Sequence, residues 1–266
     1  MGAVHLAVAD LDRSLAYYDE RLGLRVHRRE NGSAALGTGG ADLLVLREQH
    51  GAPPADGYSG LFHFALLVPS RGSLGAFLAH AAEDRLPLTG LSDHWVSEAI
   101  YLRDPDHHGV EIYADRPRSL WEGRVEEGMT TLPLDTQDLL AAADTSFDGL
   151  PPSTRIGHVH LRVAEIPGTV AFYRDRVGFD LQGLFGPQAA FLAAGGYHHH
   201  VAANTWESAG APQAPEGSAT LERITVIVPS EAVLDDVETR TGGERTAAGL
   251  ALRDPSGNPV LVTHDG

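Results

Sequence analysis

The sequence predicts an α+β protein made of four consecutive modules, each with the order strand–helix–strand–strand–strand. The main observation is an internal repeat, because three segments of the first half recur in the same order in the second half. The pairs are VHLAVADLDRSLAYYDERLGLRV (4–26) with VHLRVAEIPGTVAFYRDRVGFDL (159–181), FALLVPS (64–70) with ITVIVPS (224–230), and YLRDPDHHGVEI (101–112) with ALRDPSGNPVLV (251–262). A second observation is that a new strand–helix pattern begins at Leu61 and again at Leu221, which divides each half in two.

Each half opens with an alternating strand that leads into an amphipathic helix. The segments VHLAV and HVHLRV alternate in the manner of strands, and 11–22 and 166–177 then show helical spacing. Gly23 and Gly178 suit the ends of these helices. Short strands are expected next, at 34–36 and 42–47 in the first half and at 189–192 and 198–203 in the second.

The repeat also predicts how the chain is divided. We expect an N-terminal domain of two modules at 1–115, a connector at 116–154 with one short helix at 136–143, and a C-terminal domain at 155–266. No run approaches the ~18–20 apolar residues that cross a bilayer, and the N-terminus has no basic stretch before an apolar block. We therefore expect a cytoplasmic protein with no membrane segment.

Composition narrows the chemistry. The 266 residues include no cysteine, which excludes disulfides, thiolate metal sites and cysteine nucleophiles. The formal net charge of −16 disfavours nucleic acid as a partner, because such a surface repels phosphate groups. The chain has 14 histidines, so a transition metal would be held by imidazole and carboxylate groups.

The densest group of candidate functional residues is His63, His94, Tyr101 and Glu111. His63 begins the apolar strand HFALLV, and Glu111 lies in the strand GVEIY. Ligands on paired strands can converge on one ion, and nitrogen with carboxylate oxygen suits Fe(II), Mn(II), Zn(II) or Ni(II). A structural interpretation is also open for each residue: a core histidine, a solvent-facing glutamate, or a strand tyrosine with its hydroxyl at the surface.

The run SDHWVSEAIYLRDP…GVEIYADRP, together with GGYHHH…NTW in the second half, resembles the extradiol catechol dioxygenases of the vicinal oxygen chelate superfamily. The resemblance covers nearly the whole chain. It implies paired βαβββ modules, curled into two cup-shaped half-barrels around a metal. The same superfamily also contains isomerases, epimerases, thiol transferases and drug-binding proteins.

The resemblance assigns His63 and Glu111 as metal ligands, His94 as the acid/base residue, and Tyr101 as the hydrogen-bond partner of the chelating substrate oxygen. The remaining ligand of the family lies on the first strand, where this chain has Ala3. His5 shares that strand face and is the expected third ligand, although it lies two residues along the strand.

His158 is the alternative third ligand, which requires modules to pair across the duplication. A site made from the C-terminal half alone is not expected, because Arg223 and Leu261 stand at the positions of His63 and Glu111. His198 and His200 of the triplet 198–200 would share one strand face. They could line the second cup or form hydrogen bonds across strands.

We therefore expect an extradiol dioxygenase that uses Fe(II), with Mn(II), Zn(II) or Ni(II) as other metals. Its substrates would be a catechol-like diol or another small molecule with vicinal oxygens, and O2. Two alternatives are a glyoxalase-like isomerase or lyase, and a drug-binding protein without catalysis. Four modules could close two cups within one chain, so both a monomer and a homodimer are compatible with the sequence.

Overall fold

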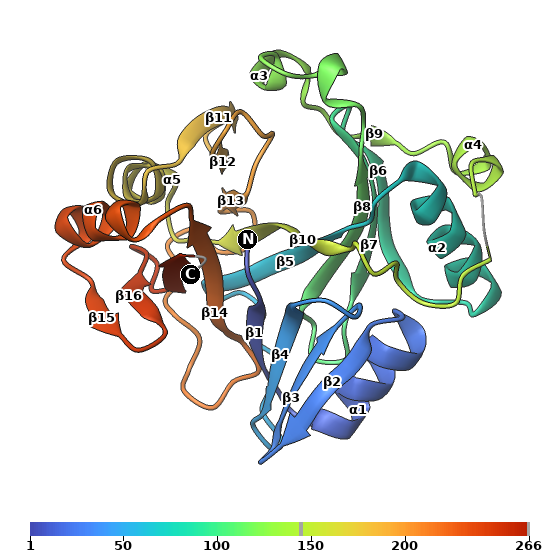
Figure 1. Cartoon of the computed structure of the whole chain (residues 1–266), viewed down its shortest axis with the longest axis horizontal. Helices are drawn as coiled ribbons and strands as arrows, with labels where there is room; N and C mark the ends of the chain where they lie inside the picture. The colour runs from blue at the N-terminus through green and yellow to red at the C-terminus, as the bar shows by residue number, and fades with distance from the viewer. Residues whose placement is uncertain (144–145, 265–266) are drawn as a thin grey trace.

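The four expected modules are present in the computed structural model, which describes residues 1–143 and 146–264 (Figure 1). The first consists of β1 (Val4–Val8), α1 (Leu11–Leu15), β2 (Arg25–Glu30), β3 (Ser33–Gly37) and β4 (Asp42–Glu48). The second consists of β5 (Gly60–Leu67), α2 (Arg71–Glu83), β6 (Leu88–Asp93), β7 (Ser97–Arg103) and β8 (Gly109–Asp115). The third consists of β10 (Arg155–Arg162), α5 (Ile166–Ala171), β11 (Asp180–Phe185), β12 (Ala189–Ala193) and β13 (Val201–Asn204). The fourth consists of β14 (Leu221–Val228), α6 (Glu231–Thr241), β15 (Glu244–Thr246), β16 (Gly249–Arg253) and β17 (Pro259–His264).

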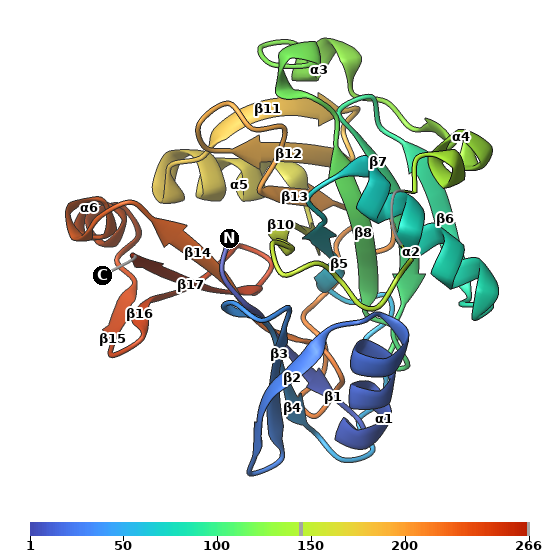
Figure 2. The same ribbon diagram turned by 45° about the vertical axis from the view of Figure 1, so that its right-hand side comes forward.

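The modules form two curled sheets, and each sheet takes one module from each half of the chain. One sheet has the order β15-β16-β17-β14-β1-β4-β3-β2, so it joins the first module to the fourth. The other has the order β11-β12-β13-β10-β5-β8-β7-β6-β9 and joins the second module to the third. The joints are the antiparallel pairs β1–β14 and β5–β10. Figure 2 shows β5 and β10 near the centre of the molecule. The chain thus has an α+β fold of two half-barrels.

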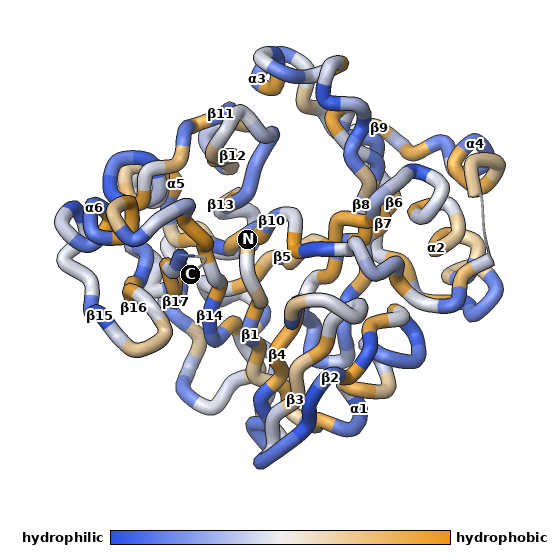
Figure 3. Tube along the Cα trace, viewed as in Figure 1, coloured by the Kyte–Doolittle hydropathy of each residue, from blue (hydrophilic) through white to orange (hydrophobic). Residues whose placement is uncertain are grey.

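Apolar residues concentrate in the strands, and hydrophilic residues gather in the outer loops and in β2 (Figure 3). The helices lie on the outer faces of the sheets (Figure 1). Leu6, Leu44, Phe64 and Ile112, on strands of both sheets, are fully buried in the main core. Burial of such side chains is the principal stabilising contribution to the fold. None of the helices in the described residues is long and apolar enough to cross a membrane.

The first helix of each half differs from the expected continuous α-helix. α1 changes to a π-helical segment at Ala16–Arg21, and α5 does so at Phe172–Val177. A π-helical segment inserts an extra residue into the turn. In the first half this segment holds Tyr18, which is fully buried and donates a hydrogen bond of 2.8 Å to Asp104.

The connector contains more structure than the single expected helix. It holds a 3₁₀ turn (Arg118–Leu120), α3 (Val125–Gly128), β9 (Leu132–Pro133) and α4 (Thr136–Ala141). β9 extends the second sheet beside β6, and α3 packs against β11 at the other end of that sheet. The connector therefore bridges the two ends of the sheet made by the second and third modules.

A buried ion pair, Asp104 with His108, links the second module to the first through Tyr18. The two side chains are 2.9 Å apart. Burial alone would raise the pKa of Asp104, but the charge and hydrogen bonds of His108 hold it below its usual value. Burial alone would lower the pKa of His108, but Asp104 raises it above its usual value.

The pair predicts a two-sided pH dependence of stability. The contribution of Asp104 is lost as pH falls through its lowered pKa, and that of His108 is lost as pH rises through its raised pKa. The contribution is therefore largest between the ordinary values of about 3.9 and about 6.5. We expect Asp104→Asn to lower the free energy of unfolding by about 2 kcal/mol in this window, measured by urea denaturation at several pH values.

Asp254 is the matched control, since it holds the same position in the second half with Asn258 in place of the histidine. Burial raises the pKa of Asp254, so its ionisation does not stabilise the fold in the same way. Asp254→Asn should keep the two-sided pH profile of the wild type, because the Asp104–His108 pair is intact in that variant. Equal profiles for Asp104→Asn and the wild type would contradict the assignment.

Candidate metal centre

The joint between β5 and β10 brings the two halves of the candidate site together. In this pairing His158 lies opposite Ala65, and on the other side of β5, Ala65 is the neighbour of Glu111 on β8. His63 lies two residues before Ala65, so it points to the same face of the sheet. The small side chain of Ala65 leaves the space above it open to the three larger groups around it.

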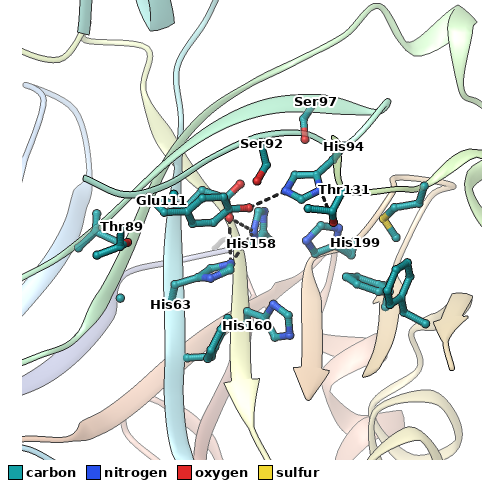
Figure 4. Close-up of a pocket in the computed structure, with 18 of the residues that line it drawn as sticks. His63, Thr89, Ser92, His94, Ser97, Glu111, Thr131, His158, His160 and His199 are labelled. Atoms are coloured by element: carbon teal, nitrogen blue, oxygen red, sulfur yellow. Dashed lines mark hydrogen bonds and ion pairs between the residues drawn. The ribbon is translucent and has the colours of Figure 1, made fainter. Parts of the chain in front are cut away.

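His63, Glu111 and His158 converge on one point (Figure 4). The Nε2 atom of His63 is 2.9 Å from Oε2 of Glu111, and that of His158 is 3.1 Å from the same oxygen. The two Nε2 atoms are 3.3 Å apart. Three ligands that occupy one face of a metal at about 2.1 Å would be separated by about 3 Å, so the triangle has the dimensions of a facial triad.

The three ligand atoms are better suited to binding a cation than to forming hydrogen bonds with one another. The two Nε2 atoms can hydrogen-bond to each other only if one is unprotonated, and that one cannot then donate to Glu111. All three residues are buried, with exposed fractions of 6% for His63 and 2% for both Glu111 and His158. A metal ion would use the lone pairs of all three atoms at once, and these residues could therefore hold one.

Electrostatics favour the ligating forms of His158 and Glu111. Burial lowers the pKa of His158 to about 4, which keeps the imidazole neutral at ordinary pH. Burial alone would raise the pKa of Glu111, but the neighbouring imidazoles hold it well below its usual range. An ionised carboxylate with neutral imidazoles is the state that metal binding requires.

His5, the expected third ligand, does not lie with this group. It sits on β1 in the other sheet, directly opposite Arg223 on β14, and its Nε2 atom is 2.7 Å from the Arg223 guanidinium. Burial and that positive charge lower the pKa of His5 to about 4. His158 takes the third position instead, because the second module pairs with the third and not with the first.

The other predicted residues, His94 and Tyr101, line the same cavity of about 380 Å³ as the triad. The Nδ1 atom of His94 is 2.8 Å from the carbonyl oxygen of Thr130, so this nitrogen donates and Nε2 is left as an acceptor. The Tyr101 hydroxyl lies 2.7 Å from that Nε2 and donates to it. Burial and the charge of Glu111 raise the pKa of Tyr101, which keeps its proton in place.

An aromatic wall closes another side of the cavity. His160 contacts Phe62, Trp206 and Phe191, with ring centroids 5.1, 5.5 and 6.0 Å from its own. The amide of Asn204 donates to Nε2 of His160, and burial keeps the pKa of this imidazole well below its usual value. This neutral ring and its neighbours give the cavity a surface suited to a flat apolar group.

Sequence reasoning did not identify His199 as a functional residue. It lines the cavity, and its ring centroid is 4.1 Å from that of His158. The triplet 198–200 was expected to belong to a strand, but β13 begins only at Val201. Residues 198–200 form a bend before β13. The side chains of His198 and His199 therefore contact each other, whereas in a strand they would point to opposite faces of the sheet. The cluster of three histidines was a compositional signal, but the bend could not be predicted from it.

The equivalent positions of the other sheet lack a ligand set. Ala3, Arg223 and Leu261 stand where His158, His63 and Glu111 stand in the sheet of the second and third modules. Among the residues that the structure describes, His63, Glu111 and His158 form the one group with the geometry of a metal site.

Comparisons with known proteins agree with this architecture. The sequence pattern of the Glyoxalase/Bleomycin resistance protein/Dioxygenase superfamily matches residues 1–112 and 155–262. The chain is 39% identical over 268 residues to a catechol-2,3-dioxygenase from Bacillus subtilis (strain 168), covering 96% of this chain and 93% of the relative.

Two solved structures share the fold at low sequence identity. Glyoxalase I from Zea mays has a TM-score of 0.61 at 18% identity, with 98% of this chain and 91% of that one covered. The cppA protein from Streptococcus pneumoniae TIGR4 has a TM-score of 0.58 at 12% identity, with 99% and 97% covered. The repeat, the two half-barrels and the full-length relative together establish that this chain belongs to the Glyoxalase/Bleomycin resistance protein/Dioxygenase superfamily.

Proposed function

We propose that this protein is an extradiol ring-cleaving dioxygenase that acts on a catechol-like diol with Fe(II) bound by His63, Glu111 and His158. The observation that carries the proposal is the buried triangle of two imidazole nitrogens and one carboxylate oxygen, open to a cavity. Two histidines and one carboxylate on one face of Fe(II) leave positions for substrate and oxygen. The relative named catechol-2,3-dioxygenase supports the same reaction.

The bound metal would supply the electron transfer between diol and O2, and the protein would supply binding and proton transfer. In the overall reaction, one bond of the aromatic ring breaks and both atoms of O2 enter the ring-opened product. The aromatic wall of Phe62, His160 and Phe191 would pack against the ring or an apolar substituent. The nearby Trp206 is 46% exposed, so a substituent could extend toward the mouth of the cavity.

Tyr101 and His94 form the proton-transfer pair of the proposal. The Tyr101 oxygen can accept a proton from a substrate hydroxyl while its own proton moves to Nε2 of His94. The carbonyl of Thr130 would stabilise the resulting imidazolium through Nδ1–H. The pair would therefore favour the ionised diol and later return the proton to the product.

Oxygen uptake tests this proposal. Protein loaded with Fe(II) under anaerobic conditions and then mixed with aerated buffer should consume O2 with at least one member of a panel of mono- and bicyclic catechols. A visible chromophore from the ring-opened product should appear at the same rate. A fully loaded protein that binds catechols without oxygen uptake would contradict the dioxygenase and favour a binding protein; conversion without uptake would favour an isomerase.

A further inference from the structure

Behind His199, a chain of hydrogen bonds runs away from the cavity to a carboxylate. The Nδ1 atoms of His198 and His199 are 2.8 Å apart. On its other side, Nε2 of His198 is 2.9 Å from Oδ1 of Asp115, the last residue of β8. His198 is fully buried, and the side chain of Asp115 is 24% exposed. The chain therefore joins the cavity to the solvent-facing end of the strand that carries Glu111.

The carboxylate sets the direction of each hydrogen bond. Asp115 can only accept when ionised, and it also accepts from the hydroxyl of Tyr197 at 2.9 Å. Nε2 of His198 must then carry a hydrogen. In a neutral imidazole this leaves Nδ1 of His198 as an acceptor, so Nδ1 of His199 must be the donor. The remaining nitrogen of His199, Nε2, is left with a free lone pair.

The surroundings leave Nε2 of His199 available to a group in the cavity. His199 lines the cavity, and Nε2 has no hydrogen bond to any residue that the structure describes. The ring lies against His158 and, on another face, against Phe191 at 5.1 Å. This packing fixes the plane of the His199 ring. The tautomer of His199 alone therefore decides whether Nε2 presents a lone pair or an N–H group to the cavity.

We propose that Asp115 and His198 are positioning residues that hold His199 in the Nδ1–H tautomer and so present its Nε2 as a proton acceptor in the cavity. The inference rests on the proposed function, to which it adds a second proton acceptor beside the metal-binding group. A carboxylate–histidine–histidine relay of this kind exerts its effect without contact between Asp115 or His198 and the substrate. It also assigns a role to two members of the histidine triplet.

The tautomer can be observed directly in the metal-free protein, without substrate or turnover. The measurement is ¹⁵N NMR of histidine-labelled protein at about pH 8, above the ordinary imidazole pKa of about 6.5. The His199 signals are assigned by their loss in His199→Gln. We expect a protonated Nδ1 and an unprotonated Nε2. A hydrogen on Nε2 of His199 in the wild type would overturn the proposal, whichever reaction the protein catalyses.

The decisive variant is Asp115→Asn, because an asparagine amide can donate to Nε2 of His198 and reverse the chain. We expect the hydrogen of His199 to move from Nδ1 to Nε2, whereas Asp115→Glu should keep the wild-type tautomer. Asp42→Asn is the matched control: it disrupts another aspartate–histidine pair, Asp42 with His27 at 2.9 Å, at a comparable side-chain exposure of 28% and in the other sheet. The tautomers of the two histidines must change together, so a folded Asp115→Asn in which Nε2 of His198 loses its hydrogen while His199 keeps its hydrogen on Nδ1 would overturn the proposal.

Activity gives a second, separable test. With Fe(II) bound, Asp115→Asn should lower kcat by about 10²-fold, the usual contribution of a positioned base. KM and metal content should stay as in the wild type, because Asp115 contacts neither substrate nor metal. Recovery of kcat in Asp115→Glu would support the relay. A variant that binds less metal, has a higher KM and has a lower kcat would indicate a purely structural role for Asp115 and would contradict the relay. If Asp115→Asn fails to fold, the wild-type spectrum still decides the tautomer.

Discussion

Replacement of His158 by alanine is expected to abolish stoichiometric metal binding and, with it, oxygen uptake. The residue supplies one of only three protein atoms in the triangle, from a half of the chain that contributes no other ligand. Because even hydrogen-bond partners of metal ligands typically change affinity by about 10–100-fold, loss of a ligand should weaken Fe(II) binding by more than about 100-fold. Anaerobic titration with Fe(II), followed by elemental analysis of the desalted protein, measures this change.

His5→Ala is the matched control for that experiment. Like His158, His5 is a strand histidine at a module joint, but it is half-buried and its partner is Arg223 in the other sheet. We expect this variant to bind Fe(II) with the affinity of the wild type. Loss of metal in His5→Ala with retention in His158→Ala would show that the first and second modules share the site, contrary to the pairing described above.

Removal of the Tyr101 hydroxyl is expected to produce the second large effect. In Tyr101→Phe the cavity keeps its shape, but the link between a substrate hydroxyl and Nε2 of His94 is lost. General acid–base groups contribute about 10²–10⁴-fold, so kcat should fall by at least about 10²-fold with metal content unchanged. His94→Gln should cause a loss of similar size, measured as steady-state oxygen uptake at saturating diol.

The double variant tests whether the two residues act as one unit. If Tyr101 passes its proton to His94, removal of both should be about as damaging as removal of either, because groups that act together show strongly non-additive effects. Losses that multiply in the double variant would mean independent roles. An unchanged kcat in Tyr101→Phe would remove the pair from the proposed mechanism.

Much of the fold could be predicted because the duplication repeats local patterns. Alternating strands, helix-start residues and Gly23 or Gly178 at helix ends depend on neighbours in sequence. Gly23 and Gly178 do adopt positive φ angles, of 79° and 105°. The π-helical segments could not be predicted, since they depend on distant partners such as Asp104 for Tyr18.

The residues of the candidate site within one module could also be predicted, whereas those that depend on how modules pair could not. His63, His94, Tyr101 and Glu111 belong to one module, where adjacent strands bring them to one cavity. The choice between His5 and His158 depended on which strand edges join, and the sequence carries no period that reports such pairing. His199 was missed because its position results from a bend at 198–200 and from packing against His158 on β10 of the same module.

Isotopically labelled dioxygen tests the central claim most directly. Fe(II)-loaded protein would react with a catechol under labelled O2, and the product would be identified by mass spectrometry. The proposed function predicts a ring-opened product that carries both labelled atoms, formed by the wild type and by His5→Ala but not by His158→Ala. A product without label, or a labelled product formed equally well by His158→Ala, would contradict a dioxygenase built on the shared His63–Glu111–His158 site.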